Sequence, residues 1–436
     1  MTKTVKLTEH GDPSEPLQLD QIDVDWIEQE NEKEEERHNR GLKKLELINS
    51  KGRFKLKAKG HVGSISLPSR KFIINIKPKF ENAWDNLFKL FDYAEGIDAS
   101  YGTSQVYADP GDTLWDIIAK IFGAHAMHLI KKGLYRTYIT KTEEITAIRG
   151  RLLLVQNIRS PQKFRIKHWC EFDELSHDVP ENQCVLYCTS MLLRYVKNTT
   201  IKQELVRIRN IILSQDVTIK HRFTLFDANL ITINRMNKDY EKIFVYCKLI
   251  LQSLAYKKFS DAEGILIPDF TISMWDLFEK FVNKVLVEHY KPKKIDVDFQ
   301  DPTKPIVRHI PDYPDIHKTP GPSPMEPDNI ISSKDGKLIL DTKWKKKVPS
   351  NDWYQAIAYS LALKCDTILL LPKVDEKYSD GFRIPEEYCR DCDDIKIHIK
   401  TIDFEQASKS GDFIKDLINQ IEDIVDKIEL KSSITQ

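Results

Sequence analysis

Apolar and polar positions alternate most regularly in the last third of the chain. Apolar residues recur at helical spacing over 272–289, which predicts a helix, and at every second position over 295–299, which predicts a strand. A proline-rich stretch at 301–327 follows. The full predicted order is helix 272–289, strand 295–299, strand 328–333, strand 337–344, helix 351–364, strand 367–371, strand 395–399 and a closing helix over 414–428.

The first two thirds contain a strand-rich region followed by helices. Residues 1–40 are polar and acidic with little periodicity, and we expect a loosely held arm or a short edge element there. Alternating apolar residues between Phe54 and Ile76, with glycine and proline between the runs, predict a small antiparallel β-module. Helical spacing returns at 84–95 and 113–133, and it dominates 151–262.

These patterns predict an α+β multidomain protein, because a length of 436 residues is too great for one ordinary core. We expect an N-terminal β-rich module, a helical middle region and a C-terminal α/β core. The predicted regions are an acidic arm (1–40), an N-terminal α+β domain (41–150), a mainly helical middle domain (151–265) and a C-terminal domain (266–436).

The composition says more about where the protein is located than about what it does. The 66 basic and 66 acidic side chains cancel, so the net charge neither favours nor excludes a nucleic-acid partner. Residues 28–36 are mostly acidic, whereas residues 51–80 carry Lys and Arg and no acid. No apolar run approaches the roughly 20 residues of a membrane helix, and the N-terminus lacks a signal-peptide pattern. We therefore expect a cytoplasmic protein that does not enter a membrane.

The cysteines favour the same compartment. There are 7 of them, an odd number without regular spacing, which is not the pattern of a secreted disulfide framework. Cys389 and Cys392 form a C-x-x-C pair, but a structural zinc site needs four ligands and no second pair has the matching spacing. We interpret this pair as incidental.

Charged residues on the strands at 328–344 have the donor chemistry of a metal site. Asp341 and Lys343 are two positions apart on one strand, so both side chains leave the same face. A turn at 334–336 is expected to bring Asp328 alongside Asp341. Two carboxylates in this arrangement suit one Mg²⁺ ion, and Lys343 would stabilise the negative charge that develops beside it.

Pro327-Asp328 followed by Asp341-Thr342-Lys343, within a helix-strand-strand-strand-helix-strand order, resembles the PD-(D/E)xK nuclease superfamily. The resemblance implies a restriction-endonuclease-like core that cuts DNA with the help of Mg²⁺. It also implies supporting roles for Gln355, on the helix after the motif, and for Glu279, on the first helix. Glu279 is equally compatible with a solvated position at the edge of an apolar stripe.

Three further stretches narrow the resemblance from a superfamily to one family. They are Gly63-Ser64-Ile65 through Ile76-Lys77-Pro78-Lys79, Ala147 to Leu152, and Cys170 to Asn182. With the nuclease motif, they resemble McrC, the nuclease subunit of the McrBC 5-methylcytosine restriction system. That family implies a partner, McrB, which is an AAA+ GTPase ring that recognises modified DNA. The resemblance further implies that domain 41–150 docks on this ring, that the chain stimulates its GTPase, and that domain 266–436 cuts methylated double-stranded DNA.

Two other functions stay open at this point. The chain has no G-x-x-x-x-G-K-[ST] loop, so it does not bind a nucleotide in P-loop fashion itself. A non-catalytic assembly factor that only docks on a GTPase ring would share this property. A stand-alone repair nuclease with the same core would cut DNA without any GTPase partner.

Overall fold

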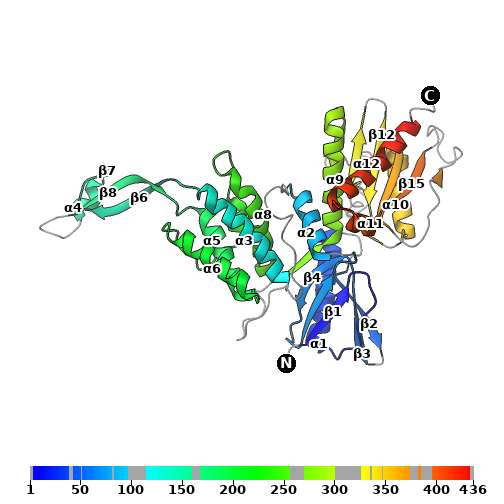
Figure 1. Ribbon diagram of the computed structural model, residues 1–436, viewed down its shortest axis with the longest axis horizontal. Helices are drawn as coiled ribbons and strands as arrows, with labels where there is room; N and C mark the ends of the chain where they lie inside the picture. Colours follow the sequence, from blue (N-terminus) through cyan, green and yellow to red (C-terminus); the bar gives the residue numbers. More distant parts are fainter. Residues whose placement is uncertain are drawn as a thin grey trace, which may run out of the picture. The chain divides into compact units, whose positions relative to one another are not determined.

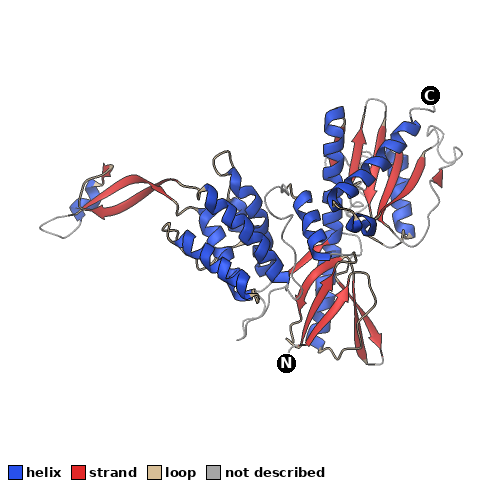
Figure 2. Ribbon diagram, viewed as in Figure 1, coloured by secondary structure: helices blue, strands red, loops and turns tan. Residues whose placement is uncertain are grey.

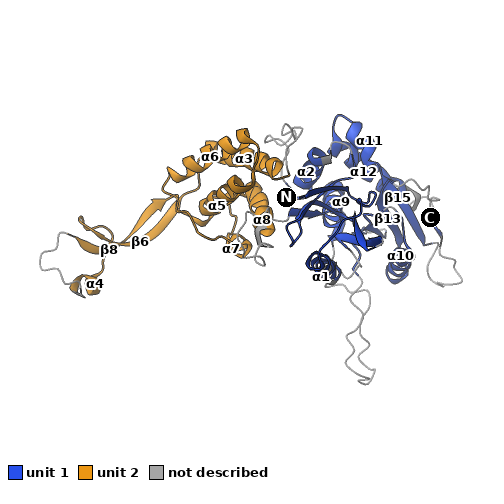
Figure 3. Cartoon of the chain, turned by 90° about the horizontal axis from the view of Figure 1, so that it is seen from below, with its two compact units in different colours: residues 1–98, 270–436 blue, residues 99–269 orange. Residues whose placement is uncertain are grey.

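The computed structural model describes residues 3–38, 43–50, 52–80, 83–96, 114–159, 167–255, 270–299, 326–333, 336–345, 347–373, 382–383 and 395–432. The chain divides into two compact units, one of residues 1–98 and 270–436 and the other of residues 99–269 (Figure 3). Both contain helices and β-sheet (Figures 1 and 2), which confirms the mixed multidomain class that the sequence predicts. None of the helices in the described ranges has the length and apolar character that crossing a bilayer requires.

The first unit contains a four-stranded sheet in the order β1-β5-β4-β9. Its strands are β1 (Lys3–Thr8), β4 (His61–Ser66), β5 (Phe72–Lys77) and β9 (Phe270–Ser273). β4 is antiparallel to β5 and to β9, whereas β1 lies parallel to β5 at one edge. The hairpin of β2 (Leu45–Ser50) and β3 (Arg53–Ala58) shares a core with this sheet. The predicted antiparallel β-module is confirmed, with β1 and β9 added to it.

Gly63 allows β9 to pair with β4 across a long stretch of sequence. Its φ is +139°, a region that favours glycine, and a Cβ atom there would lie 1.9 Å from the carbonyl oxygen of Phe270 in β9. Any side chain at this position would push the two strands apart. The glycine of the Gly63-Ser64-Ile65 stretch is therefore a requirement of the sheet.

The first 40 residues differ from the arm that the sequence suggests. β1 fits the expectation of an edge element, but residues 21–38 form helix α1 (Gln21–His38). Two of its acidic side chains, Glu30 and Glu34, are buried and pair with the ammonium of Lys44 at 2.9 and 3.2 Å. Because a buried carboxylate needs such a partner, part of the acidic run at 28–36 holds the helix in place rather than facing water.

A six-stranded sheet in the order β10-β11-β12-β13-β15-β14 forms the other half of this unit. The strands are β10 (Asp296–Phe299), β11 (Asn329–Ser332), β12 (Lys337–Thr342), β13 (Asp366–Pro372), β14 (Phe382–Arg383) and β15 (Lys396–Ile402). β10, β11 and β12 are antiparallel neighbours, whereas β12, β13 and β15 run parallel. Residues 301–325 of the proline-rich stretch, and Cys389 and Cys392, lie outside the described residues.

Helices cover the six-stranded sheet. α9 (Met274–Tyr290) precedes its strands and α10 (Ser350–Leu363) lies between β12 and β13 in the chain, which confirms the predicted helix-strand-strand-strand-helix-strand order. α10 packs on apolar residues of β13 and β15, and α12 (Phe413–Ser432) lies on the opposite side of these strands (Figure 3). α2 (Ala83–Ala94) and α12 pack against α9, and α11 (Phe404–Lys409) packs against α12.

The second unit is a helical bundle with a small sheet. Its helices are α3 (Leu114–Lys132), α5 (Pro180–Tyr195), α6 (Thr199–Leu213), α7 (Leu225–Leu230) and α8 (Glu241–Ala255). A three-stranded sheet of β6 (Thr137–Ile145), β8 (His168–Ser176) and β7 (Arg151–Leu152), with the short helix α4 (Leu154–Arg159), was not predicted. This unit places α3 with the middle helices, whereas the sequence places it with the N-terminal domain.

Candidate active site

The hairpin of β11 and β12 brings Asp328 and Asp341 together. Asn329 pairs with Leu340 at the end of the register of these strands, so Asp328 and Asp341 are the two residues immediately beyond the last pair. Neither side chain is exposed, at 0% each. This register agrees with the sequence-based expectation that the two aspartates lie side by side.

Thr342 fixes the carboxylate of Asp328. Its backbone N–H and its hydroxyl both donate to Oδ2 of Asp328, at 2.8 and 2.7 Å. Because Thr342 directly follows Asp341, these bonds hold Asp328 against the strand that carries the other aspartate. Sequence analysis treats Thr342 only as the middle residue of the motif, since a contact between strands depends on a register that no local pattern reports.

Lys343 completes a buried group of three charged residues. Its ammonium forms an ion pair with Asp341, and its side chain is only 5% exposed. The backbone N–H of Lys343 donates to the carbonyl oxygen of Leu370 in β13 at 2.8 Å, which fixes this residue at the end of β12. The structure therefore places Asp328, Asp341 and Lys343 close to one another, as the sequence predicts.

Gln355 is connected to this group through a tyrosine. It lies on α10 one turn before Tyr359 and donates to the Tyr359 hydroxyl at 2.7 Å. That hydroxyl donates to the backbone oxygen of Glu326 at 2.9 Å, two residues before Asp328. Gln355 thus supports the segment that leads into Asp328, and Tyr359 is a member of this arrangement that sequence analysis did not select.

Glu279 is buried on α9 at 7% exposed, so the solvated position that the sequence left open is wrong. One turn further along α9, the side-chain amide of Asn283 donates to Oδ1 of Asn329 at 2.9 Å, which places this helix over the start of β11. Glu279, Asp328 and Asp341 do not form a tight metal cage. Within the described ranges, one group of three or more His, Cys, Asp or Glu side chains has all its ligand atoms within 4.8 Å of one another. That group consists of cysteines in the second unit.

Comparison with known proteins bears on the family and the fold of the chain. A family model described as McrBC 5-methylcytosine restriction system component matches residues 56–371. The chain belongs to this family. The resemblance to the McrBC system drawn from the sequence is thereby confirmed.

Individual members show how far the likeness to the McrBC family extends. The chain is 24% identical over 329 residues to the type IV methyl-directed restriction enzyme EcoKMcrBC of Escherichia coli (strain K12), covering 69% of this chain and 88% of that protein. Its fold is similar to a chain of the refined half-complex from the tetradecameric assembly of Thermococcus gammatolerans McrB AAA+ hexamers with bound McrC. That match has a TM-score of 0.65 and 17% identity, and it covers 97% of this chain and 100% of the other.

In this member of the McrBC family, Trp344 links the candidate site to the N-terminal sheet. It follows Lys343 and is almost completely buried, and its indole N–H donates to the carboxylate of Glu9, which follows β1 and is 1% exposed. The ammonium of Lys79 lies 4.4 Å from the centroid of the same ring. Neither Glu9 nor Trp344 belongs to a pattern that sequence reasoning recognised, because their contact joins residues that are 335 positions apart.

Two other family stretches have structural roles in the second unit. The side-chain amide of Asn182 donates to the backbone oxygens of Tyr135 and His177 at 2.8 and 2.7 Å, which ties the start of α5 to the segment before β6. Gly150 has a φ of +65°, and a Cβ atom there would lie 2.3 Å from the backbone oxygen of Glu171 in β8. Glycine at this position therefore lets the chain pass close to the strand.

The donors at the hairpin suit a hard divalent cation. Asp328 and Asp341 offer carboxylate oxygens, which are the protein ligands that Mg²⁺ prefers. Asp341 lies in β12 and Asp328 directly precedes β11, where its carboxylate is fixed by two hydrogen bonds from Thr342. A site on rigid elements with fixed ligands keeps its geometry when a substrate arrives.

Proposed function

We propose that this chain is the Mg²⁺-dependent DNA endonuclease subunit of a GTP-driven, modification-dependent restriction complex. The observation that carries the proposal is the buried group of Asp328, Asp341 and Lys343 on one hairpin, in the element order of a PD-(D/E)xK nuclease. Charged groups in a protein interior add little stability compared with apolar residues of the same size. Such a group is therefore expected where chemistry requires it.

Each residue of the group has a distinct role in the proposed reaction. Asp328 and Asp341 would hold the metal ion, which when bound lowers the pKa of a water molecule and polarises the phosphate. Thr342 keeps the Asp328 carboxylate in place through two hydrogen bonds. The Lys343 ammonium, which Asp341 orients, donates to a phosphate oxygen as negative charge develops there.

Gln355 and Glu279 act as supporting residues in this proposal. Gln355 positions the backbone segment that leads into Asp328, through the Tyr359 hydroxyl. Glu279 lies buried on α9, the helix that also contacts β11 through Asn283. Their substitution should therefore reduce the cleavage rate less than substitution of Asp341 does.

The partner in this proposal is an McrB-like AAA+ GTPase ring, and the substrate is methylated double-stranded DNA. Family membership supports both, as does the similarity to a methyl-directed restriction enzyme and to a chain from an assembly of McrB hexamers with bound McrC. The absence of a P-loop sequence from the chain agrees with an energy source on another subunit. We propose that docking also stimulates GTP hydrolysis by the ring.

Plasmid cleavage distinguishes this function from the two alternatives. The purified chain is incubated with methylated or unmethylated plasmid and Mg²⁺, with and without the GTPase partner and GTP. The proposal predicts cutting of methylated plasmid in the complete mixture alone. Cutting without partner and GTP would identify a stand-alone nuclease. Stimulated GTP hydrolysis without any cutting would identify a non-catalytic assembly factor.

A further inference from the structure

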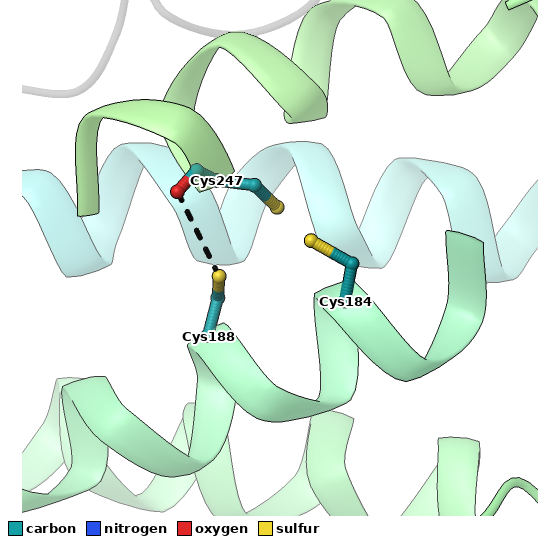
Figure 4. A group of neighbouring side chains, drawn as sticks. All are labelled: Cys184, Cys188 and Cys247. Carbon is teal, nitrogen blue, oxygen red and sulfur yellow. Dashed lines mark hydrogen bonds between the residues drawn. The ribbon is translucent and has the colours of Figure 1, made fainter. Parts of the chain in front are cut away.

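Three cysteine side chains meet in the interior of the second unit. Cys184 and Cys188 lie one turn apart on α5, and Cys247 approaches them from α8 (Figure 4). All three are 0% exposed and none is in a disulfide. Their sulfur atoms lie within 4.8 Å of one another.

This arrangement exceeds what packing alone requires. Residues four positions apart on a helix share a face, so Cys184 and Cys188 present both thiols in one direction. A single buried cysteine is an ordinary small apolar residue. Here the third sulfur comes from a different helix, and the Cys184 and Cys247 sulfur atoms point toward each other rather than into separate parts of the core (Figure 4).

A hydrogen bond within the cluster joins the two helices. The Cys188 thiol donates to the backbone oxygen of Cys247 at 3.9 Å (Figure 4). A thiolate is the form of cysteine that binds metal ions, so an ion held here would replace the thiol protons.

We propose that Cys184, Cys188 and Cys247 form a three-sulfur site for a soft metal ion of the Cu(I) class. Structural zinc is almost always bound by four ligands. In the part of the chain that the structure describes, no fourth His, Cys, Asp or Glu ligand atom joins this cluster. Soft thiolate ligands select Cu(I), which leaves a three-sulfur site suited to that ion.

The ion would join α5 to α8, and these helices already pack against each other. α5 begins shortly after β8 ends, so a clamp between the two helices also fixes the base of the β6-β8-β7 sheet. Because the cluster is fully buried, the ion enters during folding or transient opening and leaves slowly. This site is independent of the nuclease proposal, since its three residues belong to the other compact unit.

The test uses the full chain, produced in copper-supplemented cells, purified without oxygen and then incubated with Cu(I) in a competing chelator. Bound copper is measured by elemental analysis, and the number of sulfur ligands by X-ray absorption. We expect one ion per chain, three sulfur neighbours and a higher unfolding temperature of the second unit. Cys247→Ala should abolish binding, whereas Cys170→Ala, at another buried free cysteine of this unit, should leave it intact.

Several results would overturn the proposal. They are a folded wild-type chain that takes up no copper, copper retained by Cys247→Ala, and a site that prefers Zn²⁺ with four ligands. If Cys247→Ala does not fold, the sulfur count and the copper-dependent change in unfolding temperature are still measured on the wild type. A count below three, or no change in unfolding temperature, then contradicts the proposal.

Discussion

Replacing Asp341 alone should destabilise the first unit far more than replacing Asp341 and Lys343 together. Asp341→Asn leaves the ammonium of Lys343, whose side chain is 5% exposed, without the carboxylate that pairs with it. Removing one partner of a buried ion pair destabilises the fold by about 3–5 kcal/mol, whereas replacing both partners with apolar residues is neutral or stabilising by about 1–4 kcal/mol. We therefore expect a loss of about 3–5 kcal/mol for Asp341→Asn and little or no loss for Asp341→Leu combined with Lys343→Met.

Hydrogen exchange at the backbone amides of β12 measures this difference, because it reports the opening of the first unit separately from the second. Lys71 and Asp20 provide a matched control in the same unit, since this pair has a separation of 2.8 Å and side chains that are 58% and 41% exposed. Solvent screens such a pair, so Asp20→Asn should cost much less. Equal costs for Asp341→Asn and Asp20→Asn would refute the reasoning from burial.

Three further predictions concern the surroundings of the site and the second unit. Thr342→Val removes the hydroxyl that lies 2.7 Å from Asp328, and the loss of about 1.5–3 kcal/mol of hydrogen bonding to a charged group should raise the Mg²⁺ concentration needed for cleavage. An unchanged Mg²⁺ titration would contradict this role. Trp344→Phe keeps an aromatic ring but leaves the buried carboxylate of Glu9 without the indole donor, so thermal melting of the first unit and plasmid cutting should both decline. Wild-type values for both would show that the contact is dispensable. Burial lowers the pKa of His125 to about 4. The unfolded chain takes up a proton below about pH 6.5 while the folded unit stays neutral, so stability falls as pH drops from about 6.5 toward 4, by about 2 kcal/mol at pH 5. His125→Phe should flatten the pH dependence of melting of the second unit, and an undiminished slope would assign the effect to other groups.

The local elements of the C-terminal domain could be predicted from the sequence because their signals are local. The apolar stripe of α9 and the continuous apolar runs of β12 and β13 are visible in short windows. The period of two residues along a strand also sufficed to place Asp341 and Lys343 on one face. Their ion pair in the structure follows directly from that spacing.

Contacts between distant segments could not be predicted in this way. β9 pairs with β4, and Glu9 meets Trp344, although the residues involved are hundreds of positions apart. The sequence suggested a loosely held arm or a short edge element over 1–40, since the cation that pairs with Glu30 and Glu34 lies outside that window. The cysteine cluster was missed for the same reason, because Cys247 comes from a different helix than Cys184 and Cys188.

The most direct test of the central claim compares Asp341→Asn with Asp352→Asn in the complete mixture of chain, GTPase partner, GTP, Mg²⁺ and methylated plasmid. Cleavage and GTP hydrolysis are measured in the same reaction, so loss of the complex is distinguished from loss of chemistry. We predict that Asp341→Asn abolishes cleavage while GTP hydrolysis continues, and that Asp352→Asn retains both. Undiminished cleavage by Asp341→Asn would show that the site of DNA cutting lies elsewhere in the chain or in its partner.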